Sequence, residues 1–136
     1  MIVFLALDNQ NGMMLNNRRQ SRDSVLNQKM FDMIENKKLM IHSFSQKLLA
    51  KDFANKIIIR DDFIDVAQSG DICFVENQHL SSHVDKISTI YVFRWNRDYL
   101  ADFMLDIDLS KWHKEVVEDF VGSSHECITL EKYMKI

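Results

Sequence analysis

The stretch Ile2-Val3-Phe4-Leu5-Ala6-Leu7 decides the fold, and the turn signal Asp8-Asn9-Gln10-Asn11-Gly12 closes it. Six consecutive apolar residues before a turn predict a strand buried on both faces, as in the centre of a parallel or mixed sheet. Ligands of open α/β sheets bind beyond the carboxyl ends of such strands. We therefore look for chemistry first in the segment 8–23.

The rest of the chain continues the α/β pattern. Short apolar runs predict three further buried strands, at 39–41, 56–59 and 72–75. The polar segment 13–22 is typical of an exposed loop, and apolar spacing predicts helices at 23–36, 43–53, 61–68 and 78–84. Longer, partly alternating runs predict antiparallel strands at 89–95, 115–121 and 127–133. The expected fold is a mixed, mainly parallel central sheet flanked by helices, with an antiparallel C-terminal edge.

Composition narrows the class of protein. A chain of 136 residues with 46% apolar and 27% charged residues predicts one globular domain over 1–136. The net charge of −3 argues against a nucleic-acid partner. Without a run near 20 apolar residues or a signal-peptide pattern, we expect a cytoplasmic protein with no membrane contact. Its two cysteines, Cys73 and Cys127, are expected to be buried, reduced thiols.

The succession of these features resembles the dihydrofolate reductase family over the whole chain. The resemblance rests on the first strand with Asp8 and Asn11-Gly12, on Asp23 opening a helix, and on Lys38 before a short strand. It continues through Ile90-Tyr91-Val92, the acidic stretch 102–108, Trp112, and the closing strands that contain 118–120 and 127–131. It implies the fold of that family and, in an active member, NADPH-dependent reduction of dihydrofolate with Asp23 as the acid.

The positions with which that family binds its ligands differ here. His42-Ser43-Phe44-Ser45 stands in place of the phosphate-binding Gly-Arg-x-Thr, and Glu76-Asn77 in place of the paired glycines at the nicotinamide dinucleotide. Phe4 and Phe93 replace a small alanine of the pterin pocket and a threonine that buttresses the acid. Asp52-Phe53-Ala54-Asn55 replaces the motif for the folate tail, and the chain is short between 59 and 72. A carboxylate at Glu76 would repel a pyrophosphate, so no cofactor is expected.

Two kinds of candidate site remain. Asp23 is the catalytic acid if the chain is an active reductase, and otherwise a helix N-cap. Residue types common at interfaces predict an interaction surface formed by Arg18, Arg19, Arg22, Trp95, Arg97 and Tyr99. The basic residues among them could equally belong to a solvated loop, and the aromatic ones could pack over the sheet edge. A zinc site at His79 and His83, which are spaced i, i+4, is a further alternative without an evident third ligand.

Two functions follow from these observations. The first is a reductase-like protein without reductase activity that binds and modulates another macromolecule. The Asn-, Lys- and Ile-rich composition favours a phage or mobile-element origin and a host protein as the partner. The alternative is a divergent dihydrofolate reductase that uses NADPH. Neither the partner nor the oligomeric state follows from the sequence.

Overall fold

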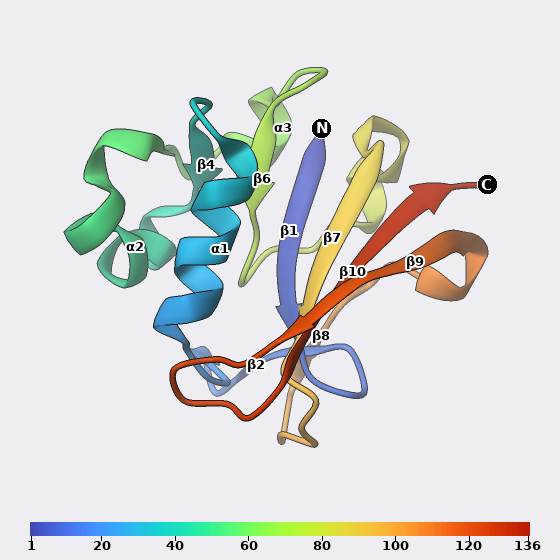
Figure 1. The fold of residues 1–136 in the computed structure, drawn as a ribbon. Coiled ribbons are helices and arrows are strands. Elements are labelled where there is room, and N and C mark those ends of the chain that lie inside the picture. Colours follow the sequence, from blue (N-terminus) through green and yellow to red (C-terminus); the bar gives the residue numbers. More distant parts are fainter.

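The computed structural model describes residues 1–136 and places the first strand at the centre of a seven-stranded sheet. The strand order is β5-β4-β6-β1-β7-β10-β9 (Figure 1). Strands β1 (Ile2–Leu7), β4 (Leu39–Ile41), β5 (Ile57–Ile59), β6 (Ile72–Phe74) and β7 (Thr89–Arg94) run parallel. The two strands β9 (Trp112–Phe120) and β10 (Ile128–Lys135) close the sheet in antiparallel fashion. The predicted α/β class with its antiparallel C-terminal edge is confirmed.

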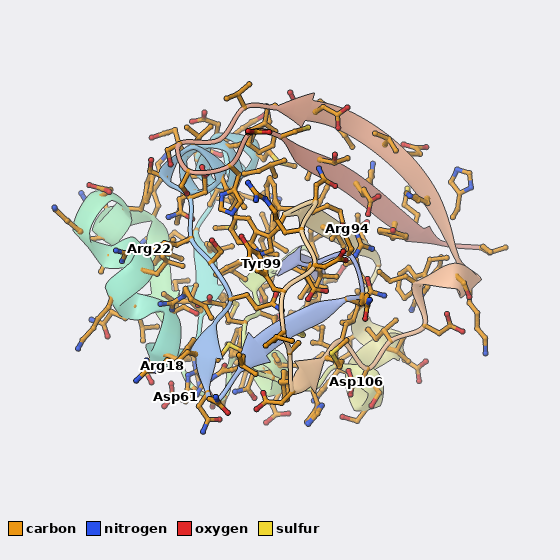
Figure 2. The ribbon with its side chains drawn as sticks, turned by 90° about the horizontal axis from the view of Figure 1, so that it is seen from below. Arg18, Arg22, Asp61, Arg94, Tyr99 and Asp106 are labelled. Carbon is orange, nitrogen blue, oxygen red and sulfur yellow. The ribbon has the colours of Figure 1, made fainter.

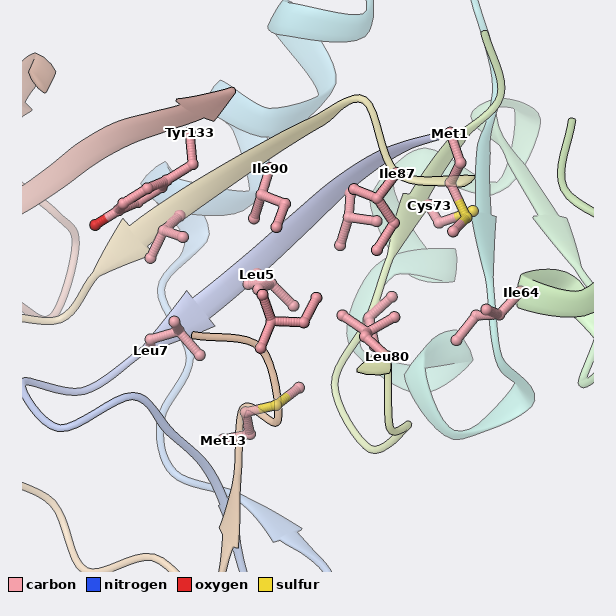
Figure 3. Close-up of a cluster of buried hydrophobic side chains, with 14 of the residues drawn as sticks. Met1, Leu5, Leu7, Met13, Ile64, Cys73, Leu80, Ile87, Ile90 and Tyr133 are labelled. Atoms are coloured by element: carbon pink, nitrogen blue, oxygen red, sulfur yellow. The ribbon is translucent and has the colours of Figure 1, made fainter. Parts of the chain in front are cut away.

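Two layers cover this sheet. Helices α1 (Ser24–Ile34) and α2 (Gln46–Phe53) bury Leu26, Met30, Phe31 and Leu49 against one face. The other face is covered by α3 (Phe63–Val66), the 3-10 helix η3 (Ser81–Lys86) and a small three-stranded sheet. This small sheet has the order β3 (Arg18–Arg19), β2 (Gly12–Leu15), β8 (Phe103–Met104). Figure 3 shows the packing on this second face, where Leu5 and Leu7 of β1 meet residues such as Met13 and Leu80. Shorter 3-10 turns lie at Ser43–Ser45, Ala54–Lys56 and Leu109–Lys111.

The segment 13–22 is not the exposed loop that its polarity predicts. It contains β2 (Gly12–Leu15) and β3 (Arg18–Arg19), and β2 also pairs with β8 (Phe103–Met104). Asn16 and Asn17 both have positive φ, as the two-residue turns of tight hairpins require. Met13 and Met14 are buried in the core, and this apolar pair is the signal that outweighs the surrounding polar residues.

Other boundaries also differ from the sequence prediction. Strand β5 lies at the sheet edge with Ile58 and Ile59 each 40% exposed, so it is not a buried strand. Strand β7 is parallel to β1 and antiparallel only to β10, because it joins the two halves of the sheet. The helix predicted at 61–68 is the single turn α3, and the one predicted at 78–84 is η3, displaced toward the C-terminus.

Phe4 belongs to the core between the sheet and α1. Its ring is 2% exposed, and its centroid lies 5.1 Å from that of Tyr91 and 6.1 Å from that of Phe93. Phe93 is fully buried in the same cluster. Phe4, which the resemblance placed at the pterin pocket, and Phe93, which it placed at the buttressing threonine, are therefore structural, and their rings fill the space beneath α1.

Candidate functional site

The carboxyl ends of β1, β6 and β7 meet at one edge of the sheet, which Figure 2 shows from below. Asp8 follows β1 and is 1% exposed. Its carboxylate accepts hydrogen bonds from the amides of Gln10 and Gly12, at 2.8 and 2.7 Å, and from Gln20 Nε2 at 2.8 Å. Because its oxygens are occupied in this way, Asp8 fixes the turn that leads from the central strand into β2.

An ion pair crosses the strand ends beside Asp8. Arg19 of β3 donates from Nε and from its terminal nitrogen to the two carboxylate oxygens of Glu76, at 2.8 and 3.0 Å. Ser45, buried before α2, donates its hydroxyl to Glu76 Oε1 at 2.7 Å. The Arg19 guanidinium also lies over the Phe44 ring, 4.9 Å from its centroid. Glu76 thus connects the hairpin, β6 and the start of α2.

Little space remains behind this ion pair. The cavity enclosed by the strand ends has a volume of about 10 Å³ and is lined by Ala6, Met13, Arg19, Gln20, Ser21, Val75, Glu76 and Trp95. A volume of this size is close to the smallest that holds one water molecule. The space directly behind the ion pair is therefore filled by side chains of the chain itself, and a hollow of about 300 Å³ lies nearby, lined by Met14, Asn17, Phe44, Asn77, Asp102 and Phe103.

Asp23 is the N-cap of α1, as one of its two predicted roles requires. Its Oδ1 accepts from the amides of Val25 and Leu26 at 3.0 and 3.2 Å. The loop between β9 and β10 covers the rest of the carboxylate, with the amides of Ser123 and Ser124 at 3.0 and 2.8 Å. Burial, the largest single influence, raises the pKa of Asp23, but these amides and His125 together outweigh it and hold the pKa well below its ordinary value of 3.8.

His125 was not singled out as a site residue by the sequence, yet it is buried at the centre of this region. Its Nδ1 lies 3.0 Å from Asp23 Oδ2, and its ring stacks on Trp95 with centroids 4.5 Å apart. Its Nε2 lies 3.1 Å from the hydroxyl of Ser21 and 3.1 Å from that of Tyr99. A methyl group at Gly122 would overlap the Asp23 carboxylate, so this glycine lets the loop approach. The run Gly122-Ser123-Ser124 was the only sequence signal of such a loop.

The predicted interaction surface is only partly a surface. Arg18, Arg22 and Arg97 are exposed, and Tyr99 is half-buried. Figure 2 shows Arg18 and Arg22 on the side toward α2, with Tyr99 nearer the middle of the view. Two members were wrongly placed: Trp95 is 4% exposed because it packs on His125, and Arg19 is held by Glu76. A hollow of about 720 Å³ lies beside the hairpin, lined by Leu15, Asn16, Arg18, Arg19, Gln20, Tyr99 and Leu100.

A buried polar network supports the hairpin from the other side. Arg94, at the end of β7, donates from Nε to Glu131 Oε1 at 2.6 Å and from a terminal nitrogen to the Asp8 carbonyl at 3.0 Å. Lys114 lies 2.9 Å from Glu131 Oε2, and the Tyr133 hydroxyl donates to Glu131 Oε1 at 2.9 Å. Burial, the largest influence, raises the pKa of Glu131, but the hydrogen bonds from Arg94 and Lys114 outweigh it, so this pKa is lowered.

The remaining candidates have ordinary surroundings. His79 lies near Asp106 and His83 near Asp65, and no group of three or more His, Cys, Asp or Glu side chains lies close enough to hold a metal ion. The i, i+4 spacing does not bring the two imidazoles together, because His79 precedes and His83 lies within a 3-10 helix, whose period is three residues. Cys73 is buried, which raises its pKa to about 12, whereas Cys127 is exposed just before β10. No helix is long and apolar enough to cross a membrane.

Comparison with known proteins identifies the architecture. No family model and no curated protein matches the sequence. Among solved structures, a dihydrofolate reductase from Enterococcus faecalis, complexed with NADP(H) and RAB-propyl, superimposes with a TM-score of 0.67 over 98% of this chain and 94% of that one. The two sequences are 11% identical, so the likeness is one of fold. The chain therefore has the dihydrofolate reductase fold, as the order of its sequence features predicted.

Proposed function

We propose that this chain is a protein-binding domain with the dihydrofolate reductase fold that does not reduce dihydrofolate. The observation that carries the proposal is the Arg19–Glu76–Ser45 cluster at the strand ends, with only about 10 Å³ left behind it. A pterin ring needs far more volume than one water molecule occupies. Binding a substrate there would require breaking a bidentate ion pair that is already satisfied.

The donor set at this edge does not fit the pyrophosphate of a nicotinamide dinucleotide. Phosphate sites at helix N-termini offer unpaired backbone amides and cations. Here Glu76 places a negative charge beside the start of α2, and it occupies both the Ser45 hydroxyl and the Arg19 guanidinium. A second anion would meet this carboxylate at close range, with the one nearby cation already neutralised.

The exposed side of the same region carries the proposed binding surface. It consists of the hollow beside the hairpin together with the exposed side chains Arg18, Arg22, Arg97 and Leu100. Leu100 is 79% exposed, and Arg18 has no carboxylate within ion-pair distance. An exposed apolar side chain that shares a hollow with an unpaired arginine suits contact with an acidic protein surface. The Asn-, Lys- and Ile-rich composition supports a phage or mobile-element origin and a host protein as the partner.

Calorimetric titration with NADPH, together with an assay of dihydrofolate reduction, tests whether the chain lacks reductase function. We expect no heat of binding at high micromolar NADPH and no turnover of dihydrofolate, because Glu76 repels the phosphates and the space behind its ion pair is too small for a pterin. A useful companion is the Glu76→Gly/Arg19→Ala double variant, which removes both halves of the ion pair and is expected to enlarge the cavity. Saturable NADPH binding by the unmodified chain, with reduction of dihydrofolate at an ordinary enzymic rate, would overturn the proposal.

Capture from host extract tests the binding role. Protein that carries a photo-crosslinker in place of Arg97 and is otherwise unchanged is expected to form a covalent adduct with one partner, identified by mass spectrometry. The Leu100→Ser and Arg18→Glu variants should reduce that adduct at least tenfold, since one buried apolar anchor or charge pair is worth about 1.4 kcal/mol or more. Val116→Ser serves as the control, because Val116 is also an exposed apolar residue, at 60%, and lies on β9 outside the residues that line the hollow. An adduct that is unchanged in all three variants would place the partner elsewhere.

A further inference from the structure

Three side chains from two distant segments form a row beside the hollow. Ser21 Oγ lies 3.1 Å from His125 Nε2, and His125 Nδ1 lies 3.0 Å from Asp23 Oδ2. Nothing in the proposed binding role uses this row. A hydroxyl, an imidazole and a carboxylate connected in that order form the arrangement that activates a serine for attack on a carbonyl group.

The hydrogen-bond partners fix the roles within the row. The Asp23 carboxylate accepts four backbone hydrogen bonds and can only accept from His125, so the imidazole hydrogen is assigned to Nδ1. Nε2 then carries the free lone pair, which can accept a hydrogen bond from the Ser21 hydroxyl. Stacking on Trp95 holds the ring plane, and the side chains of Asp23 and His125 are 0% and 3% exposed. The base is therefore oriented and shielded from water before any reaction begins.

Ser21 itself is half-buried, and its neighbours Gln20 and Tyr99, but not Ser21, line the open hollow. The cavity of about 10 Å³ reaches Ser21 from within, and Gln20 separates that cavity from the open hollow of about 720 Å³. Neither the Ser21 amide nor the Arg22 amide donates a hydrogen bond within the chain. These two consecutive amides are available to a developing oxyanion, since the nucleophile's own amide often serves in this way.

We propose that Ser21 is a nucleophile, that His125 is its general base, and that the chain hydrolyses small esters of aromatic alcohols. The inner cavity is too small for an acyl group, so the ester reaches the half-buried Ser21 hydroxyl from its exposed side, where a small acyl group meets the least obstruction and the leaving alcohol lies toward Tyr99 and Leu100. This activity goes beyond the proposed binding role and does not depend on it. Asp23 acts through His125 and is a positioning residue.

The chemical steps balance with water as the only co-reactant. Ser21 Oγ attacks the ester carbonyl carbon while its proton passes to His125 Nε2, and a bond forms between Oγ and that carbon. The ester C–O bond then breaks, and the alcohol leaves with the proton from Nε2. Water attacks the acetyl-serine in the same way, which releases acetate, returns the proton and restores the hydroxyl of Ser21.

Tyr99 gives the proposal a distinctive signature. Its hydroxyl lies at the same 3.1 Å from Nε2 as that of Ser21, so the two hydroxyls compete for one lone pair. Tyr99→Phe removes the competitor and leaves the ring in place. We expect this variant to acetylate at Ser21 several-fold faster than the wild type. A structural role for the His125 cluster predicts no such increase.

The experiment follows p-nitrophenyl acetate hydrolysis and the labelling of Ser21 by a fluorophosphonate, with the adduct located by peptide mass spectrometry. Ser21→Ala should abolish the label at that peptide, and His125→Gln should slow it by about 100-fold or more, the usual contribution of a general base. Ser24→Ala is the matched control, because Ser24 is an exposed serine at the first position of α1. The p-nitrophenyl butyrate ester should react at least tenfold more slowly than the acetate.

Asp23→Asn separates positioning from folding, because asparagine retains an N-cap acceptor. The imidazole ¹⁵N spectrum should show His125 protonated at Nδ1 in the wild type and a changed tautomer in this variant, together with slower labelling. Labelling of Ser21 at the same rate in folded His125→Gln, or no label on Ser21 in either the wild type or Tyr99→Phe, would overturn the proposal. Thermal unfolding of each variant establishes that it is folded.

Discussion

Replacing Asp23 with alanine is expected to lower the free energy of unfolding by about 3–5 kcal/mol, because several buried hydrogen-bond donors lose their acceptor at a cost of about 1–3 kcal/mol each. The side chain of Asp23 is completely buried, and it accepts backbone hydrogen bonds at the start of α1 and from the loop after β9. Alanine would leave these amides and His125 Nδ1 without acceptors. Urea unfolding followed by circular dichroism measures the change.

The Asp23→Asn variant separates the loss of helix capping from the loss of the contacts to the loop after β9. Asp23→Asn can still cap α1 through its side-chain oxygen, but it cannot supply a carboxylate to the loop, so we expect about half of the alanine effect. Asp32→Ala is the matched control, because Asp32 is exposed on the same helix and should change stability by less than about 0.5 kcal/mol. Equal losses for Asp32→Ala and Asp23→Ala would contradict the assigned role.

The stability that Asp23 provides should also depend on pH. Its pKa in the folded chain lies below the ordinary value of 3.8 that applies to the unfolded chain. For a carboxyl whose folded pKa is depressed, the contribution is complete above the unfolded pKa and is lost as pH falls toward the folded pKa. The difference in unfolding free energy between wild type and Asp23→Asn should therefore shrink below about pH 4. A difference that grows on acidification would contradict the lowered pKa assigned to Asp23 in the folded chain.

The sequence was informative where a local pattern determines the structure. The run Ile2–Leu7 predicts a central strand because a strand with both faces buried has no polar alternation to disguise it. Asp23 predicts a helix start because capping depends only on the next few residues. The order of such local features along the chain was enough to predict the dihydrofolate reductase fold.

The contents of the site could not be predicted in the same way. The contact between Asp23 and His125 spans 102 residues, and that between Arg19 and Glu76 spans 57. Pairs at such separations leave no periodic mark in a single sequence. Trp95 illustrates the same limit, because residue type placed it on an interface whereas a histidine from a distant loop buries it. The hairpin at 13–19 was missed because two buried methionines among polar residues look like a loop.

The Arg94–Glu131 network helps to position the hairpin that carries part of the proposed binding surface. Arg94 is 14% and Glu131 7% exposed in their side chains, and the Arg94 guanidinium also holds the Asp8 carbonyl and the Asn11 side chain. Asp8 and Asn11 form the turn from which the β2–β3 hairpin starts. The hairpin that carries Arg18 is therefore positioned by a charge pair on the opposite side of the turn.

Glu131→Ala is expected to cost about 3–5 kcal/mol, because it leaves the Arg94 charge buried and removes the partner of Lys114. Replacing both partners, as Arg94→Met/Glu131→Leu, leaves no buried charge unpaired, so its cost should fall below the summed costs of Arg94→Met and Glu131→Leu by about 0.5–3 kcal/mol. A double-mutant cycle in urea measures this coupling. Lys114→Met, whose ammonium is half-exposed, should cost less than about 1 kcal/mol. Strictly additive losses would mean that Arg94 acts through the Asp8 carbonyl and Asn11 alone, and the hairpin would then owe its position to the turn rather than to the buried pair.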